Sequence, residues 1–342
     1  MENWIKSQGR NDDLVLSSRI RLARNLNKIP FPHKMDEEGG KKLIKDVENA
    51  FYTSSHTEDK FKTIRLWENG FIDNEVFFDK HLISKNLLDN TSKAAFIVDE
   101  NETVSIMINE EDHIRIQGIT SGLDLEEVQD LCGKIDNLLE EKLDYAFDEN
   151  LGYLTTCPTN IGTGLRASVM IHLPSLTITN KMNGVLNAVT QVGMTVRGLY
   201  GEGSKARGNI YQVSNQITLG LSEEEIISNL KAVVSQIINE ENLSRENLIR
   251  KYKYETEDRI YRALGILKSA VLLNPDECLK LLSDVRLGVE MGIIKDVSKV
   301  VLNNLLVDTQ NAVIQQLYDK KLSSKERDLS RAKLIRERLV EK

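Results

Sequence analysis

The stretch from 153 to 166 constrains the fold most, because it joins two apolar segments through a polar turn that contains two glycines. The first segment is β-prone and ends at Cys157, and the second begins at Arg166. Gly162 and Gly164 lack a Cβ, so the backbone there can adopt a positive φ and approach a ligand closely. We predict a strand, a tight loop and a second strand, with the Arg166 guanidinium placed to meet phosphate oxygens.

These glycines do not form a Walker A loop, because no lysine follows them and no helical pattern opens behind them. Two ordinary explanations stay open at this point. Glycine-rich turns are common in simple hairpins, and an isolated cysteine such as Cys157 is more often a small buried apolar residue than a nucleophile. The segment therefore needs support from other parts of the chain.

The composition narrows the class of protein. The chain has 342 residues, enough for two domains, and 40% of them are hydrophobic. A net charge of −7 argues against direct binding to nucleic acid. Cys132, Cys157 and Cys278 are far apart, which argues against a disulfide framework and a zinc site, so we expect no resident metal. The first residues do not form a signal peptide and no apolar run is long enough to cross a bilayer, so we expect a cytoplasmic protein without membrane contact.

Alternation and helical spacing predict the order of the elements. Two strands, 94–98 and 104–108, form an antiparallel hairpin, and a helix covers 123–143. A closing strand follows at 209–218, and Ser222 starts the next helix with a capping box. The last third of the chain has helical spacing throughout. We therefore expect an α+β domain followed by an all-α domain.

Three further motifs carry charge. Arg19 and Arg21 are two residues apart, so in a strand both project from one face, although a solvated basic edge strand would show the same pattern. The run 109–113, Asn-Glu-Glu-Asp-His, crowds three carboxylates that repel one another unless a cation offsets them; a solvated acidic turn is the alternative. The segment 197–208 holds four glycines, which makes it a candidate lid over a bound substrate.

At these four motifs the sequence resembles the guanidino (phosphagen) kinases, the family of creatine and arginine kinase. The resemblance covers about the first 240 residues. It implies an ATP:guanidino phosphotransferase whose catalytic domain, 1–240, is a large antiparallel sheet flanked by helices, similar to glutamine synthetase, with an added helical domain over 241–342. It also implies ATP with Mg²⁺ as the phosphoryl donor, a transfer that depends on positioning and on compensation of negative charge.

The resemblance assigns the nucleotide to arginines in place of a P-loop, with His81 beside the base. The implied nucleotide-binding residues are Ser17, Ser18, Arg19, Ile20, Arg21, His81, Arg115, Arg166, Ala167, Ser168, Val169, Met170, Arg197, Gly198, Leu199, Tyr200, Gly201 and Glu202.

The acceptor requires a carboxylate, because a guanidinium has a pKa far above neutral and is a poor nucleophile while protonated. A carboxylate can hold its fork in line and accept a proton as the N–P bond forms. By the resemblance, Glu111 corresponds to the catalytic glutamate, Glu202 to a second anchor in the lid, and Cys157 to the active-site cysteine, which we interpret as support for a cationic substrate.

The C-terminal part points to the kind of guanidine. Phosphagen kinases carry a helical domain that encloses the free amino acid, whereas only 16 residues precede Ser17 here. This departure, the added helices and the motif Arg-Asp-x-x-Arg-Ala resemble the bacterial protein arginine kinases. The resemblance implies that Arg327, Asp328 and Arg331 bind phosphoarginine, with arginine at the phosphate and Asp328 at the guanidino group. Solvated charge on a final helix is the ordinary alternative.

The same resemblance implies protein substrates with exposed arginines, marking of these proteins for a Clp-type unfoldase and protease, and phosphorylation of a heat-shock transcriptional repressor. It also implies a small zinc-binding activator protein and a homodimer. Two other functions stay open: a kinase of a small guanidino metabolite, and a catalytically inactive adaptor that binds phosphoarginine.

Overall fold

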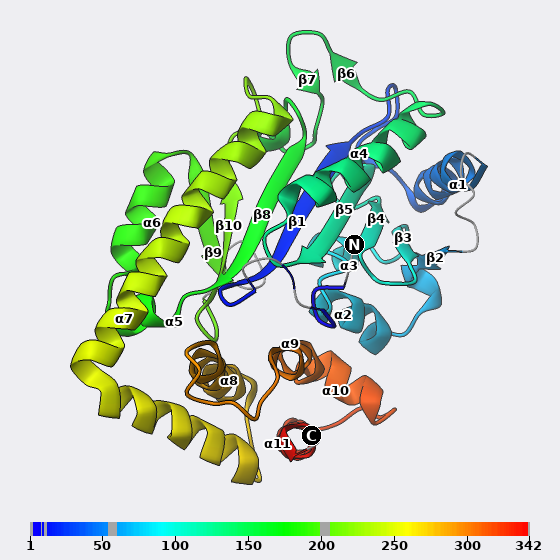
Figure 1. Ribbon diagram of the computed structural model, residues 1–342. Coiled ribbons are helices and arrows are strands. Elements are labelled where there is room, and N and C mark those ends of the chain that lie inside the picture. The colour runs from blue at the N-terminus through cyan, green and yellow to red at the C-terminus, as the bar shows by residue number, and fades with distance from the viewer. Residues whose placement is uncertain (1–2, 8, 10–11, 54–59, 199–205, 341–342) are drawn as a thin grey trace.

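A large antiparallel sheet with helices on both faces, followed by a helical bundle, makes up the fold (Figure 1). The computed structural model describes residues 3–7, 9, 12–53, 60–198 and 206–340. The predicted class, an α+β sheet region followed by a helical C-terminal region, is confirmed.

Eight strands form the main sheet in the described part of the chain, in the order β2-β3-β4-β5-β1-β8-β10-β9. They are β1 (Val15–Arg24), β2 (Phe61–Arg65), β3 (Ala95–Asp99), β4 (Val104–Ile108), β5 (Ile114–Ser121), β8 (Leu165–His172), β9 (Met194–Gly198) and β10 (Ile210–Asn215). The predicted hairpin of β3 and β4 is confirmed. Because β1 pairs with both β5 and β8, the edge strand considered for Arg19 and Arg21 is wrong, and both arginines lie in the middle of the sheet.

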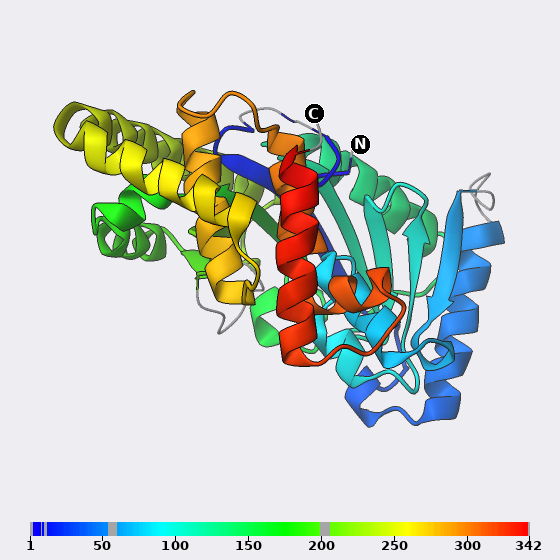
Figure 2. The same ribbon diagram turned by 90° about the horizontal axis from the view of Figure 1, so that it is seen from below.

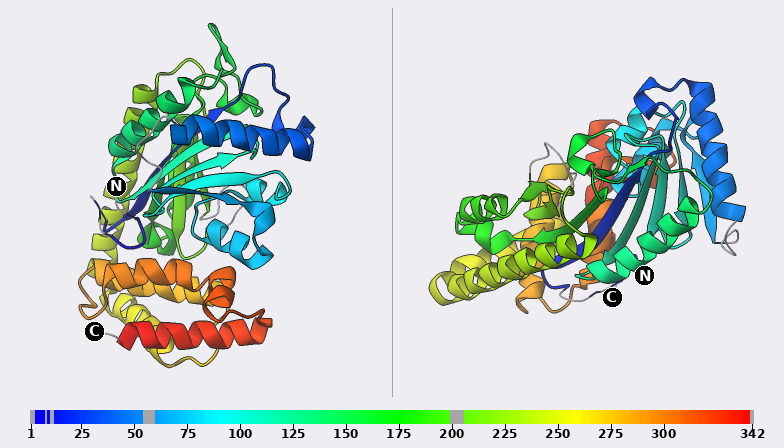
Figure 3. Two further views of the ribbon diagram at one scale, coloured as in Figure 1. Left: turned by 90° about the vertical axis from the view of Figure 1, so that its right-hand side faces the viewer. Right: turned by 90° about the horizontal axis from the view of Figure 1, so that it is seen from above.

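The helices cover both faces of this sheet and form the bundle. They are α1 (Glu37–Thr53), α2 (Phe71–Asp79), α3 (Lys85–Asp89), α4 (Leu125–Glu140), α5 (Pro174–Ile178), α6 (Met182–Gln191), α7 (Glu223–Ser269), α8 (Pro275–Glu290), α9 (Lys299–Asp308), α10 (Asn311–Leu317) and α11 (Ser324–Val340). Figure 3 shows α1 on one side of the sheet and the bundle of α8 to α11 on the other.

Alternation along the strands gives the sheet two different faces. On one face Ile20, Leu22 and Val169 are buried in a hydrophobic core with α1, α4 and the first half of α7. The other face is apolar only at its ends. Met107 packs there in the cluster that includes α3, and Met170 packs against the bundle. The middle of this second face is left for polar and charged side chains.

Local caps start two of the helices, and the one at Ser222 confirms the predicted capping box. Ser222 Oγ accepts a hydrogen bond from the Glu225 backbone N–H, and the Glu225 carboxylate accepts one from the Ser222 N–H. The Asn274 side chain accepts from the Glu277 N–H, with Pro275 in the first turn. Each cap satisfies backbone donors that the first helical turn leaves unpaired.

The segment before the glycine turn differs from its prediction. Its strand, β7 (Gly152–Tyr153), has two residues and pairs with β6 (Phe147–Asp148) instead of with β8. Beyond it, the Thr156 N–H donates to Asp112 Oδ1 at 2.7 Å, in place of a ladder bond. The predicted strand–loop–strand is therefore wrong in its first strand, whereas the second strand, β8, is confirmed.

The predicted domain boundary between 240 and 241 lies inside α7. Tyr252 (φ −137°, ψ 42°) is the non-helical residue within this helix. Before it, Val234 packs on the core of the sheet, and after it, Ile260 packs in the bundle. A helix, and not a flexible linker, thus connects the two regions, and their division at 240 stays a prediction.

Candidate active site

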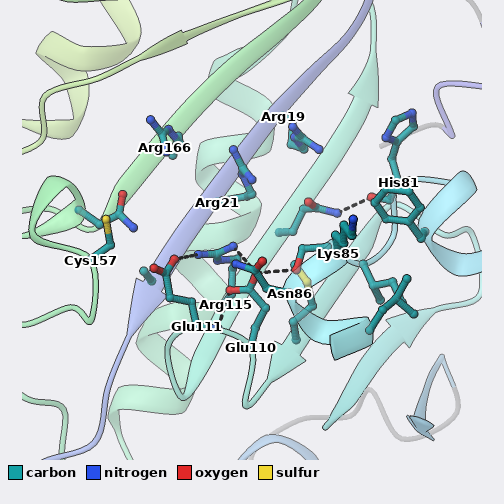
Figure 4. Close-up of a pocket in the computed structure, with 18 of the residues that line it drawn as sticks. Arg19, Arg21, His81, Lys85, Asn86, Glu110, Glu111, Arg115, Cys157 and Arg166 are labelled. Carbon is teal, nitrogen blue, oxygen red and sulfur yellow. Dashed lines mark hydrogen bonds and ion pairs between the residues drawn. The ribbon is translucent and has the colours of Figure 1, made fainter. Parts of the chain in front are cut away.

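A cavity of about 900 Å³ lies over the polar middle of the sheet (Figure 4). Strands β1, β5, β8, β9 and β10 contribute side chains to its floor, and α2, α3 and the turn between them contribute to one wall. A cavity of this size accommodates a small-molecule ligand.

Arginines from four strands of the sheet, β1, β5, β8 and β9, line this cavity. Arg21 lies directly opposite Arg166 in the β1–β8 ladder, and Arg19 projects from the same face two residues earlier, as their spacing predicts. Figure 4 shows Arg19, Arg21 and Arg166 on two neighbouring strands. The arginines that line the cavity are Arg19, Arg21, Arg115, Arg166 and Arg197. The sequence-predicted cations are thus brought together.

Two of these arginines, Arg19 and Arg21, form no ion pair with the carboxylates that the structure describes. Arg19 donates to Ser168 Oγ at 3.3 Å and to Gln212 Oε1 at 2.6 Å, and Arg21 Nε is buried without a hydrogen-bond partner among the described residues. Burial, with the charges of Arg115 and Arg166, lowers the pKa of Arg19 to about 10. Burial and neighbouring arginines also lower the pKa of Arg21, although the charge of Glu110 opposes this shift. A polyanion would relieve this repulsion and supply acceptors, so the floor favours a phosphate chain.

Glu110, for which the sequence predicts no separate role, fixes the acidic side of the cavity. Its side chain is fully buried and accepts from Arg115 Nη1 at 2.8 Å, from Ser84 Oγ at 2.5 Å and from the Glu111 backbone N–H at 2.7 Å. Both carboxylate oxygens are therefore occupied. Glu110 thus holds Arg115, and its contact with the next residue fixes the backbone of Glu111.

The rest of the acidic turn is equally fixed, so the solvated acidic turn is wrong. Asn109 has φ 61°, and its Nδ2 donates to the carbonyls of Gly40 and Lys93. Asp112 Oδ1 accepts from Asn25 Nδ2 at 2.7 Å. His113 Nδ1 accepts from a backbone N–H, and its Nε2 donates to the Pro30 carbonyl at 2.8 Å. Asn109, Asp112 and His113 are all buried, whereas Glu111 opens to the cavity.

Glu111 is the half-buried carboxylate of this turn. Its Oε2 lies 3.4 Å from Arg115 Nη2. Burial raises the pKa of Glu111, and the nearby Arg115 opposes that rise while Glu110 and Asp112 add to it. A carboxylate with a raised pKa is a stronger base than an ordinary one, and this one faces the same cavity as the arginines.

The segment before the glycine turn brings Cys157 to the end of the cavity that lies away from His81 (Figure 4). Cys157 Sγ lies 3.0 Å from Thr159 Oγ1. Gly164 has φ 64°, and a Cβ there would lie 2.6 Å from the Ala23 carbonyl oxygen. We expected the glycines to allow a close approach to a ligand. At Gly164, the close approach is to the backbone of β1.

His81 lies at the end of the cavity away from Cys157 (Figure 4). Its backbone has φ 62°, and its carbonyl accepts from Gln117 Nε2 at 2.8 Å. Burial and the charge of Arg19 lower the pKa of His81 to about 3, so its imidazole is neutral at physiological pH.

Part of the predicted nucleotide set faces away from the cavity. The side chains of Ile20, Ala167 and Val169 are buried in the core on the opposite face, because they alternate with the cavity residues. Ser18 is buried and donates to the Gly122 carbonyl. Ser17 is buried too, Ser168 contacts Arg19, Met170 packs against the bundle, and Gly198 ends β9.

The predicted residues Leu199, Tyr200, Gly201 and Glu202, and with them most of the candidate lid, lie outside the described residues. Several residues that line the cavity were not predicted: Phe71, Ser84, Lys85, Asn86, Glu110, Gln117 and Gln212. Strand alternation could have indicated Gln117, two residues after Arg115, and Gln212 in the closing strand. The α2–α3 wall has no comparable signal in the sequence.

The predicted phosphoarginine motif lies on α11, in the helical bundle. Arg331 is fully buried and donates to the carbonyls of Thr309 and Leu273, to Asp328 Oδ1 and to Asn311 Oδ1, each at 2.7–2.8 Å. Arg327 is half-buried and donates to the Leu322 carbonyl. Solvated charge is therefore wrong for Arg331, whose guanidinium holds three other segments of the bundle together.

No three His, Cys, Asp or Glu side chains within the described ranges converge as metal ligands would. None of the helices in this part of the chain has the length and apolar character needed to cross a bilayer.

Comparisons with known proteins match two family models and full-length relatives. Residues 42–244 match the family model "ATP:guanido phosphotransferase, C-terminal catalytic domain", and residues 253–342 match "Protein-arginine kinase McsB C-terminal domain". A protein-arginine kinase of Clostridium kluyveri is 69% identical over 341 residues, covering 99% of both chains. One from Clostridium acetobutylicum is 56% identical over 339 residues, covering 99% of this chain and 100% of the other.

Solved structures show the same fold. Lombricine kinase has a TM-score of 0.59 at 26% identity, covering 69% of this chain and 68% of that one. The duplicated taurocyamine kinase of Schistosoma mansoni, with bound transition-state-analogue components, has a TM-score of 0.60 at 24% identity, covering 78% of this chain and 39% of that one.

Proposed function

The chain belongs to the ATP:guanido phosphotransferase family and is a protein arginine kinase with ATP as its phosphoryl donor, and we propose that the cavity described above carries out this transfer. The observation that carries the proposal is the position of Glu111 beside a floor of arginines, of which Arg19 and Arg21 form no ion pair with a carboxylate among the described residues. The floor binds the phosphates, and Glu111 receives the guanidinium of the target arginine.

The chemistry follows from these positions. The target guanidinium loses a proton to the Glu111 carboxylate as its nitrogen attacks the γ-phosphorus. The N–P bond forms, the bond from phosphorus to the β–γ bridging oxygen breaks, and ADP leaves with that oxygen. The arginines compensate the charge that spreads over the transferring group, which is the main source of catalysis in phosphoryl transfer.

Mg²⁺ fits this site as a companion of the nucleotide. Mg²⁺ commonly binds through substrate phosphates, water and one or two carboxylates, and does not require a full protein cage. Glu111 is a carboxylate at the cavity with room for another contact, whereas both oxygens of Glu110 are occupied. When bound, the ion would neutralise part of the phosphate charge, and Glu111 is the residue that would contact its shell.

A labelling assay tests the proposal. The protein is incubated with ATP and Mg²⁺ and with either free arginine or an arginine-rich protein, and the phosphate is located by mass spectrometry together with its acid lability. We expect acid-labile phosphate on arginine residues of the protein. Label on the free amino acid alone would contradict the protein substrate and favour a kinase of a small guanidino metabolite.

Glu111→Gln tests the assignment of the base. Glutamine keeps the shape of the side chain and removes its ability to take a proton. We expect kcat to fall by about 10²–10⁴-fold, the usual contribution of general base catalysis, with little change in thermal unfolding. Turnover by Glu111→Gln at the wild-type rate would show that another group accepts the proton.

The cellular role is a further part of the proposal, supported by the relationship to protein arginine kinases. The phosphorylated proteins are marked for a Clp-type unfoldase and protease, and a heat-shock transcriptional repressor is among the substrates. A small zinc-binding protein activates the kinase, which acts as a homodimer in the cytoplasm. The α11 motif, with Arg327 and Asp328 at its partly accessible end, binds phosphoarginine.

A further inference from the structure

His81 is held in a backbone conformation that non-glycine residues rarely adopt. Its φ of 62° lies in the left-handed region, and it occurs at a residue that lines the reaction cavity. Such a conformation persists only where the surroundings determine it, and it is common at ligand sites. The contacts of His81 with its neighbours therefore determine its backbone conformation.

Two kinds of contact hold His81. On the backbone, its carbonyl accepts from Gln117 Nε2 at 2.8 Å, and its N–H donates to the Phe78 carbonyl at 2.9 Å. On the side chain, the imidazole lies against the indole of Trp4, with ring centroids 5.7 Å apart and planes at 57°. That separation and tilt are typical of a favourable aromatic pair.

Trp4 itself is fixed by the helical bundle. Its side chain is 2% exposed and belongs to the apolar cluster that contains α8 and α9. Its carbonyl accepts from Asn303 Nδ2 of α9 at 3.4 Å, and Asn303 Oδ1 accepts from Arg286 Nη1 of α8 at 2.5 Å. The N-terminal segment is thus wedged between the bundle and the nucleotide end of the cavity.

We propose that Trp4 is a positioning residue for the nucleotide: it sets the orientation of the His81 imidazole in the cavity and links that orientation to the helical bundle. This inference rests on the proposed function, because it takes the cavity near His81 as the place of the ATP base or ribose. Trp4 does not line the cavity, so it acts through His81 alone.

The sequence provides a matched control, because it contains two tryptophans. Trp67 lies in the short turn Leu66–Glu68, where Lys41 Nζ is 5.1 Å from its ring centroid, and it does not line the cavity. Trp67→Phe leaves Trp4 as the single tryptophan, and Trp4→Phe leaves Trp67 as the single tryptophan; tryptophan fluorescence is excited selectively. Titration with ADP should change the fluorescence of Trp67→Phe and leave that of Trp4→Phe constant.

Kinetics separate positioning from stability. Trp4→Ala should raise the KM for ATP by about fivefold, the effect of losing one aromatic pair, and change kcat by less than about twofold. Trp4→Phe keeps an aromatic ring and should recover most of the affinity, and Trp67→Phe should behave as wild type. The KM for the arginine substrate should stay unchanged in all three variants.

The outcomes distinguish this inference from the proposed function. A folded Trp4→Ala protein with the wild-type KM for ATP, or an ADP response that comes from Trp67, would overturn the role of Trp4 while the kinase assignment stands. Failure of wild-type protein to bind ADP at all would overturn the proposed site. If Trp4→Ala does not fold, the fluorescence of the two phenylalanine variants decides the question.

Discussion

Two groups of enclosed arginines in this molecule have opposite electrostatic surroundings. The pocket arginines, Arg19 and Arg21, form no ion pair among the described residues, and burial with like charge lowers their pKa values, although Glu110 opposes the shift at Arg21. The interface arginines, Arg245 and Arg286, lie where α7 and α8 meet. Arg245 contacts Glu290 at 2.6 Å, and Arg286 contacts the same carboxylate at 2.7 Å.

The difference shows in the pKa of Arg245. Burial alone would lower it, but Glu290 and Glu241 reverse that effect and raise it. Burial is common to both groups, and an ion pair with a carboxylate among the described residues is what separates them. Enclosed arginines that have their anion stabilise the fold, whereas enclosed arginines without one are prepared for an anion from solution.

The strongest test of this contrast is Arg245→Ala. The change leaves Glu241, fully buried, and Glu290 without one of their partners. We expect the free energy of unfolding to fall by about 3–5 kcal/mol, as measured by urea denaturation. A loss below about 1 kcal/mol would show that the interface arginines are not structural.

Arg21→Ala should have the opposite profile. Removing one cation from a group of repelling cations costs little stability, but it removes a donor to the phosphates. We expect kcat/KM for ATP to fall by about 10²–10³-fold, with the urea midpoint nearly unchanged. Unfolding at much lower urea, comparable to Arg245→Ala, would contradict the distinction between the two groups.

The interface group should also give the stability a pH dependence. Although burial opposes its charge, His172, Arg286 and Arg245 lower the pKa of Glu290 to about 2. Because the folded value is below the usual 4.5, this stabilisation is complete above about pH 4.5 and is lost as the pH falls toward 2. We expect a loss of about 1–3 kcal/mol in acid unfolding curves, and Glu290→Gln should flatten the curve in this interval. If the stability of Glu290→Gln fell with pH as steeply as that of the wild type, Glu290 would not be the source of this pH dependence.

The smallest change in stability is expected for Arg327 of the α11 motif. Arg327 contacts a backbone carbonyl, whereas Arg331 on the same helix is buried and paired with Asp328. Arg327→Ala should lower the affinity for phosphoarginine by about tenfold in calorimetry and change stability by less than about 0.5 kcal/mol. Arg331→Ala is the control and should destabilise the bundle, because its donors satisfy the Thr309 and Leu273 carbonyls. Unchanged phosphoarginine binding in Arg327→Ala would remove this residue from the proposed reader site.

Local patterns in the sequence predicted those features that depend on near neighbours. The two-residue spacing of Arg19 and Arg21 was enough to place both on one face, and the Ser222 capping box was enough to start α7. The gathering of the arginines, Glu111 and Cys157 at one cavity was predicted from the family resemblance and not from spacing. Resemblance also assigned whole stretches to the nucleotide, although alternation sends Ile20 and Val169 into the opposite core.

Features that depend on distant partners could not be predicted. Ser84 and Glu110 are 26 residues apart, and their hydrogen bond exists only because the α2–α3 turn folds over β5. The predicted strand before the glycine turn does not form, because the Thr156 N–H donates to the side chain of Asp112, 44 residues earlier in the chain. Nothing in the motif on α11 distinguishes Arg331, which is buried by contacts with three other segments, from Arg327. Figure 2 shows how closely α11 lies to α9 and α10 in the bundle.

The apolar cluster that unites the bundle with the sheet has a consequence for how the chain can be divided. Met170 and Ile119 belong to the sheet, yet they are buried in the same cluster as Leu282 of α8 and Leu302 of α9. A fragment ending at Tyr252 would therefore expose apolar strand residues next to the cavity, and exposed patches of this kind promote aggregation. The two matched family segments, 42–244 and 253–342, thus share one buried apolar cluster.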